Sequence, residues 1–249
     1  MKRHLVLAYG LACHLFFLVV FAALLAFVGN FVLPRTIDRG ATTTLPLALL
    51  IDGLLILMFG VQHSLMARPA FKRWWTQFVP HAIERSTYVL ISGIVTVLLM
   101  VLWQPIPIVL WDAPPGALRY LLHGLFFAGW LLVPAVSLMI NHFDLFGTRQ
   151  AWLYWRGRPY EPLAFRTPWM YAWVRHPLYI GWAIAFWAAP TMTVGHLLFA
   201  AGMTAYMLIA VQFEERDLIA HFGDEYTGYQ QRVGMFAPKV LSTFSQVKS

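Results

Sequence analysis

Long apolar runs restrict what this sequence can fold into more than any other feature. Six runs of predominantly apolar residues cover positions 5–33, 45–66, 87–103, 117–140, 178–189 and 194–213. A membrane helix needs roughly 20 apolar residues to cross a hydrocarbon core about 30 Å thick. Only 12% of the chain is charged, whereas soluble domains are roughly one quarter charged. The pattern therefore predicts an all-α, polytopic transmembrane helical bundle.

The fifth run is short, which leaves the number of spans open between five and six. Pro190 separates it from the sixth run, and we expect the two to form a tight hairpin packed against neighbouring helices. The first run is about twice the length of a signal-peptide hydrophobic region, so we predict a retained membrane helix. The whole chain, residues 1–249, is expected to be a single membrane domain, with no defined structure after Pro238.

The positive charges indicate an orientation. If the N-terminus is cytoplasmic, all 18 lysines and arginines except Arg35, Arg39 and Arg119 fall on the cytoplasmic side of six runs. Short loops rich in these residues stay in the cytoplasm, which predicts a multi-pass inner-membrane protein with both termini cytoplasmic. The net charge of +7 does not indicate nucleic acid, because the basic residues lie between apolar runs. A single cysteine, Cys13, allows no internal disulfide and no cysteine-rich metal site; no metal is predicted.

Residues 175–181 read Arg-His-Pro-Leu-Tyr-Ile-Gly and open the fifth run. Proline is tolerated in a first helical turn, and the free N–H groups there attract carboxylate or phosphate. Arg175 adds a bidentate donor, and Gly181 removes a side chain where a flat ligand can approach the backbone. The motif indicates a helix start that binds an anionic group. An interfacial belt of arginine and tyrosine is the alternative interpretation.

A second polar segment follows the sixth run. Residues 213–218 read Phe-Glu-Glu-Arg-Asp-Leu, and residues 222–233 read Phe-Gly-Asp-Glu-Tyr-Thr-Gly-Tyr-Gln-Gln-Arg-Val. Helical spacing places one set of side chains on one face as the helix leaves the membrane: Glu214, Asp217, Leu218 and His221. Gly223 can end that helix, and Asp224 can begin the next. The acids by themselves are also compatible with a solvated helix face.

The motifs R-H-P-x-Y-x-G, E-E-x-x-L and F-G-x-x-Y-x-x-Y-x-x-x-V occur in this order. Together they resemble the isoprenylcysteine carboxyl methyltransferase superfamily and its phospholipid methyltransferase relatives, over residues 173–238. The resemblance implies that segment 171–238 binds S-adenosylmethionine at the cytoplasmic membrane face. It implies nucleoside contacts from His176, Tyr179 and Gly181, and contacts to the amino-acid and ribose groups from Arg175 and Glu214 or Glu215. The cofactor-binding residues implied are Arg175, His176, Pro177, Tyr179, Gly181, Glu214, Glu215, Tyr226 and Tyr229.

Residues 1–170 are left to hold the methyl acceptor. Segments 62–69, 84–88 and 141–150 resemble the family of bacterial methanethiol S-methyltransferases, and the likeness extends over nearly the whole chain. The resemblance implies methylation of a small thiol, from methanethiol to dimethyl sulfide, with membrane lipid around the chain and no obligate protein partner. The first segment is shared with NnrU proteins and haem-containing carotenoid isomerases. A haem-binding isomerase or denitrification-associated protein, a prenylcysteine or lipid methyltransferase, and a non-enzymatic scaffold therefore remain alternatives.

A thiol must lose its proton to become a strong nucleophile. His142 and Asp144 lie just past the fourth run, at the level of the cofactor motifs, which predicts a histidine base supported by an aspartate; capping of helices is the alternative role. His63 and Trp152 are predicted to contact the substrate, with haem ligation as the rival role of His63. Asp52 lies within the second run, so we expect a function or a buried partner for it.

Overall fold

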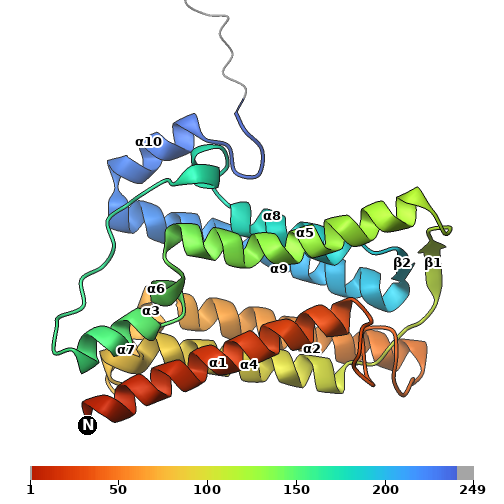
Figure 1. Cartoon of the computed structure of the whole chain (residues 1–249), viewed down its shortest axis with the longest axis horizontal. Coiled ribbons are helices and arrows are strands. Elements are labelled where there is room, and N and C mark those ends of the chain that lie inside the picture. The colour runs from red at the N-terminus through yellow and green to blue at the C-terminus, as the bar shows by residue number, and fades with distance from the viewer. Residues whose placement is uncertain (1, 240–249) are drawn as a thin grey trace, which may run out of the picture.

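The computed structural model describes residues 2–239 and is predominantly helical (Figure 1). Among these residues, five helices are long and apolar enough to cross a membrane, which confirms the prediction of an all-α, multi-pass membrane protein. The tail expected to lack structure falls almost entirely outside the described residues. The elements are α1 (Arg3–Val28), α2 (Leu45–Ala67), α3 (Pro69–Trp75), α4 (His81–Leu102), β1 (Val109–Asp112), α5 (Ala117–Ile140), α6 (His142–Leu145), α7 (Thr148–Trp155), η1 (Trp169–Ala172), α8 (Pro177–Trp187), β2 (Thr191–Thr193), α9 (Val194–Phe222) and α10 (Asp224–Arg232).

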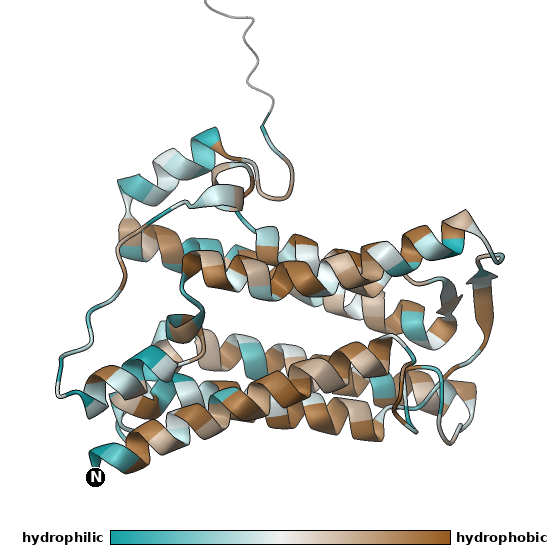
Figure 2. Ribbon diagram, in the orientation of Figure 1, coloured by the Kyte–Doolittle hydropathy of each residue, from teal (hydrophilic) through white to brown (hydrophobic). Residues whose placement is uncertain are grey.

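The long helices run side by side in two groups (Figure 1). Helices α1, α2 and α4 form one group, and α5, α8 and α9 form the other. The short helices α3, α6, α7 and α10 gather at one end, which we call the cap end; β1 and β2 lie at the opposite end. Figure 2 shows apolar residues along the long helices and polar residues concentrated at the cap end. Exposed leucines on the long helices, such as Leu15 and Leu131, need lipid around them.

A continuous aromatic core joins the two groups. Phe27 of α1, Trp130 of α5, Phe186 of α8 and Phe199 of α9 are almost completely buried in one cluster, together with Trp103 at the end of α4. Aromatic rings bury a large area each, so this cluster contributes strongly to the packing of α1 and α4 against α5, α8 and α9. The group α1, α2 and α4 and the group α5, α8 and α9 are therefore one packed unit.

Helices α5 and α8 approach each other closely through small residues. A Cβ atom added at Gly129 would lie 2.5 Å from the backbone nitrogen of Ala185, and one at Gly181 would lie 3.3 Å from Val133. Glycine permits this approach of two membrane helices. Gly129 of α5 faces Ala185 of α8, and Val133 of α5 faces Gly181 of α8, so the two helices are antiparallel. Ser137, near the end of α5, therefore lies at the level of the start of α8.

The predicted hairpin between the fifth and sixth runs is present. Helix α8 has only 11 residues, about 16 Å of helix, which is too short to cross a bilayer core. Strand β2 follows and pairs antiparallel with β1, with Val109 opposite Thr193 and Asp112 opposite Thr191. Helix α9 has 29 residues, about nine more than a bilayer requires, so its last turns extend past the apolar part of the bundle.

Asp52 is completely buried in α2. Its Oδ1 accepts a hydrogen bond of 2.8 Å from the backbone N–H of Gln104, just beyond the end of α4. The carboxyl group thus satisfies a backbone donor at a helix end, which would otherwise be costly inside a membrane protein. This contact supports a structural role for Asp52.

Candidate functional site

The start of α8 is covered by the end of the described chain. The backbone N–H of Arg175 donates to the carbonyl of Gly234 at 2.9 Å, and that of His176 donates to Met235 at 3.1 Å. His176 is the N-cap residue and Pro177 occupies the first helical position, where its missing N–H costs nothing. The predicted helix start is therefore confirmed, and residues after α10 hold it in place.

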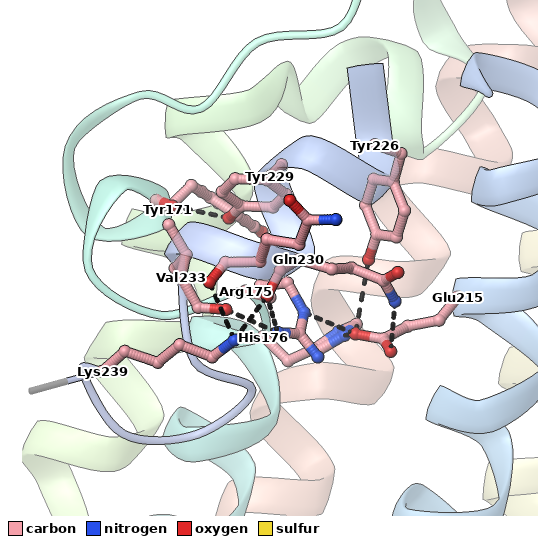
Figure 3. A network of polar contacts seen from close by, with 10 residues as sticks. Tyr171, Arg175, His176, Glu215, Tyr226, Tyr229, Gln230, Val233 and Lys239 are labelled. Atoms are coloured by element: carbon pink, nitrogen blue, oxygen red, sulfur yellow. Dashed lines mark hydrogen bonds and ion pairs between the residues drawn. The ribbon is translucent and has the colours of Figure 1, made fainter. Parts of the chain in front are cut away.

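Glu215 is the centre of a buried polar network (Figure 3). Its Oε1 accepts from Nε of Arg175 at 2.7 Å and from Nε2 of His176 at 2.9 Å, and Oε2 accepts from Nε2 of Gln230 at 2.8 Å. The hydroxyl of Tyr226 lies 3.4 Å from Oε1. The Arg175 and Glu215 side chains are only 8% and 10% exposed. A buried carboxylate is tolerated when donors surround it in this way, so Glu215 ties α8, α9 and α10 together.

Arg175 points inward rather than toward an open helix end. Besides its ion pair with Glu215, its Nη1 donates to the carbonyl oxygens of Val233 at 2.5 Å and Gln230 at 3.4 Å. The planar guanidinium matches a carboxylate and two carbonyls at once. In this structure Arg175 therefore organises the site from within, and its predicted contact with the carboxylate of a cofactor would need these bonds to rearrange.

Glu214 has a different environment from its neighbour. Its Oε2 accepts a hydrogen bond of 2.7 Å from the hydroxyl of Tyr179, whereas its Oε1 has no hydrogen-bond partner among the described residues. The Tyr179 ring stacks on His176 with centroids 5.4 Å apart. Glu214 is half-buried and is thus the acid of the pair that is available to a ligand.

Tyr171 and Tyr229 close the other side of this region. The Tyr229 hydroxyl donates to the carbonyl of Tyr171 at 2.5 Å, and burial raises the pKa of Tyr229 to about 12. Burial, and then the charge of Glu214, raise the pKa of Tyr171 as well. Both phenols therefore stay protonated at neutral pH, and Tyr229 acts as a donor. Gly181 lies elsewhere: it packs against α5, so its missing side chain serves helix packing and not the approach of a flat ligand.

His142 lies in a chain of hydrogen bonds that fixes its tautomer. Ser137 donates its hydroxyl to the carbonyl of Pro134 at 2.8 Å, so its oxygen accepts from Nδ1 of His142 at 2.7 Å. Nε2 of the neutral imidazole must then accept from Nε2 of His14 at 3.3 Å, and Nδ1 of His14 accepts from Thr148 at 2.9 Å. Burial, and then the charge of His14, lower the pKa of His142, which agrees with a neutral ring.

Asp144 does not support His142 as predicted. Its carboxylate pairs with Arg149 at 2.7 Å and lies within 3.4 Å of Gln150 and of the Tyr160 hydroxyl. The reason is the backbone at Gly147, whose φ of 85° turns the chain between α6 and α7 and brings Arg149 and Gln150 back to Asp144. The side chains that orient His142 are Ser137 and His14.

His63 lies where α2, α4 and α9 meet. Its ring stacks on Phe59 at 5.2 Å and lies 5.1 Å from Tyr88 and 6.2 Å from Tyr206. Its Nδ1 is buried without a hydrogen-bond partner among the described residues. Tyr206 precedes Glu214 on α9 by about two turns, so His63 lies on the membrane side of Glu214. Trp152, the other predicted substrate residue, is 43% exposed on α7.

Several residues of this region were not predicted from the sequence. Gln230 had a usable signal, because it follows Tyr226 by four residues on one face of α10. His14 had another, since a histidine within a membrane span suggests function. Tyr171 and Tyr206 had no such signal, because a tyrosine of a binding site cannot be distinguished in the sequence from one at the membrane interface or in the core. The described residues contain no group of three or more His, Cys, Asp or Glu side chains placed to hold a metal.

Comparison with known proteins identifies the family. The chain is 50% identical over 238 residues to the methanethiol S-methyltransferase of Mycobacterium tuberculosis, which covers 96% of this chain and 98% of that protein. A Pseudomonas protein of the same name is 49% identical over 94% of this chain and 90% of its own length.

Nurim from Sus scrofa is a more distant relative, 33% identical over 178 residues, with 67% of this chain and 66% of that protein covered. Neither a family model nor a solved structure matches the chain. The extent of the first two matches confirms the resemblance seen in the sequence motifs and favours it over the haem-protein and scaffold alternatives. The chain belongs to the methanethiol S-methyltransferase family.

Proposed function

We propose that this protein transfers the methyl group of S-adenosylmethionine to methanethiol and so forms dimethyl sulfide. The observation that carries the proposal is the match, over nearly the whole length of both chains, to proteins named for this reaction. The thiolate sulfur attacks the methyl carbon in line, the bond from that carbon to the sulfonium breaks, and the electron pair stays on the sulfur of S-adenosylhomocysteine. The thiol proton leaves to a base.

The residues around Glu214 have the chemistry that such a cofactor needs. The free Oε1 of Glu214 can accept from ribose hydroxyls or an ammonium group. The bound cofactor would supply an electrophilic methyl group. Arg175 and Glu215 would fix the position of α8 relative to α9 and α10 while the two substrates are held in line.

We place the cap end, with both termini, in the cytoplasm. Arg68 precedes α3, Lys72 lies in α3, Arg85 lies near the start of α4 and Arg149 lies in α7, all at this end. The cytoplasmic side of membrane proteins carries an excess of lysine and arginine. Glu214 and the start of α8 lie at the same end, where a charged cofactor arrives from water.

His142 is our proposed acceptor of the thiol proton. The antiparallel packing of α5 and α8 brings Ser137, and His142 bonded to it, to the level of the start of α8. Nε2 carries the lone pair but accepts from His14, so an incoming thiol would replace His14 at this nitrogen. His63 is a second candidate, because its buried Nδ1 has no partner among the described residues.

Cofactor binding tests the site independently of the acceptor. In calorimetry on detergent-solubilised protein, Glu214→Gln should weaken binding of S-adenosylmethionine by about tenfold or more, because a hydrogen bond to a charged group is lost. Glu225→Gln, which removes an exposed acid of α10, is the matched control and should bind normally. Equal affinity in both variants would refute the assignment of the site to Glu214.

A panel of acceptors tests the reaction. Headspace gas chromatography should detect dimethyl sulfide from methanethiol, whereas a prenylated cysteine peptide or a phospholipid should remain unmethylated. Turnover of a prenylated or lipid acceptor alone would overturn the proposed activity while leaving the cofactor site intact.

A further inference from the structure

A hollow of about 390 Å³ opens at the cap end between α3, α4 and α7, and neither Glu214 nor His142 lines it. Its volume lies in the range of about 300–1,000 Å³ that is usual for small-ligand sites. Its wall includes Lys72 of α3, Glu84 and Arg85 of α4, Tyr154 of α7 and Arg158 from the loop that follows. The proposed methyl transfer uses none of these residues.

The wall carries an excess of positive charge that no acid of the described residues pairs with. Among the described residues, the side chains of Lys72, Arg85 and Arg158 form no ion pair and no hydrogen bond to the protein. Glu84 is the one acid of the wall, so three cations face a single negative charge. Lys72 and Arg85 are half-buried and Arg158 is exposed, and half-buried cations without partners favour an anion that can satisfy their donors.

Two other acids of the cap end already have partners. Asp144 holds Arg149, and Asp217 holds Arg68, so neither is free to neutralise the wall of the hollow. Burial is the main cause that lowers the pKa of Lys72, and the charge of Arg85 lowers it further. A bound anion would offset the positive charges of Lys72 and Arg85.

The surroundings of the hollow resemble the headgroup region of a membrane. Helix α3 connects to α2 at the end of a membrane span and carries Trp74, which is 51% exposed, and Phe78 follows it at 68% exposed. Exposed aromatic residues of this kind lie at headgroup depth. Basic pockets at this depth on the cytoplasmic side attract anionic headgroups.

We propose that this hollow binds the phosphate of an anionic phospholipid headgroup, held by Arg85, Lys72 and Arg158. Arginine binds phosphate oxygens bidentately and lysine adds a point charge. Trp74 and Phe78 lie in the interface beside the headgroup, and the acyl chains extend along the apolar helices. The lipid would thus be bound by α3, α4 and the segment from α7 to Arg158.

The test is titration of detergent-solubilised protein with short-chain phosphatidylglycerol, short-chain phosphatidylcholine and inorganic phosphate, read by native mass spectrometry. Phosphatidylglycerol should bind one molecule per chain more tightly than either of the others. Arg85→Gln should weaken it about fivefold or more, because one cation near anionic lipid contributes about 1 kcal/mol. Arg73→Gln is the matched control, since Arg73 lies on the exposed side of α3 and outside the hollow.

Equal loss in Arg85→Gln and Arg73→Gln would overturn the proposal, because it would indicate general attraction to the basic surface. Inorganic phosphate binding as tightly as phosphatidylglycerol would also overturn it, since the ligand would then be a soluble anion. Lys72→Gln provides a second variant if Arg85→Gln does not fold, because Arg85 also lies over the ring of Tyr88. It should show the same selective weakening.

Discussion

Nε2 of His142 lies 3.3 Å from Nε2 of His14, although the two residues are 128 positions apart in the chain. The contact joins α1 to the turn after α5, and Ser137 and Thr148 complete it at either side. Each nitrogen of His142 thus has an assigned role before any substrate arrives: Nδ1 donates and Nε2 accepts.

If His142 removes the thiol proton, His142→Ala should lower turnover by about 10² to 10⁴ and leave cofactor affinity unchanged. The defect should shrink with thiols of lower pKa, which arrive already ionised. His14→Gln keeps an N–H donor for Nε2 of His142, whereas His14→Leu removes it. His14→Leu should be the slower of the two variants. Normal turnover in His142→Ala would transfer the role to His63.

The buried network predicts a large difference between two acids of α9. Glu215→Gln leaves Arg175 buried with a weaker partner, which should cost about 3–5 kcal/mol of stability. Asp217→Asn breaks a pair whose acid is 38% exposed, worth at most about 1 kcal/mol. Thermal unfolding in detergent should therefore separate the two variants clearly. Similar melting temperatures would mean that Glu215 is not the structural centre of the site.

Two glycines of α5 provide a matched pair for the packing of α8. A Cβ at Gly129 would collide with the backbone of Ala185, whereas one at Gly124 would meet nothing within 4 Å. Gly129→Ala should destabilise the protein by about 1–3 kcal/mol and weaken cofactor binding, because α8 moves away from α5. Gly124→Ala should not lower the melting temperature. Both quantities can be measured on the same detergent preparation, and unchanged cofactor affinity in Gly129→Ala would separate helix packing from the site.

The architecture was largely predictable because apolar run length decides membrane spans. The break at Pro190 and the short fifth run already indicated the hairpin of α8 and α9. The pairing of β1 with β2 was not predictable, since it joins residues about 80 positions apart in two loops that show no strand pattern of their own.

The order of the cofactor motifs correctly brought Arg175, His176 and Glu215 together, but it could not separate Glu215 from Glu214. Adjacent helical residues point about 100° apart, and which direction faces the start of α8 depends on how α9 packs. The prediction for Asp144 failed for a similar reason. Its nearness to His142 in the sequence suggested that the two side chains interact, whereas the turn at Gly147 brings Arg149 to the carboxylate of Asp144.

The length of α9 sets the depth of Glu214 relative to the membrane, and so the place where a charged cofactor and an apolar thiol can meet. Glu214 lies about 30 Å along the helix from Val194, which is the thickness of a hydrocarbon core. If Val194 lies at one face of the hydrocarbon core, Glu214 lies at the opposite face, where lipid meets water. In the proposed reaction, the charged cofactor can reach Glu214 from the water side. The apolar thiol can reach it from the lipid side, so neither molecule has to cross the medium in which it dissolves poorly.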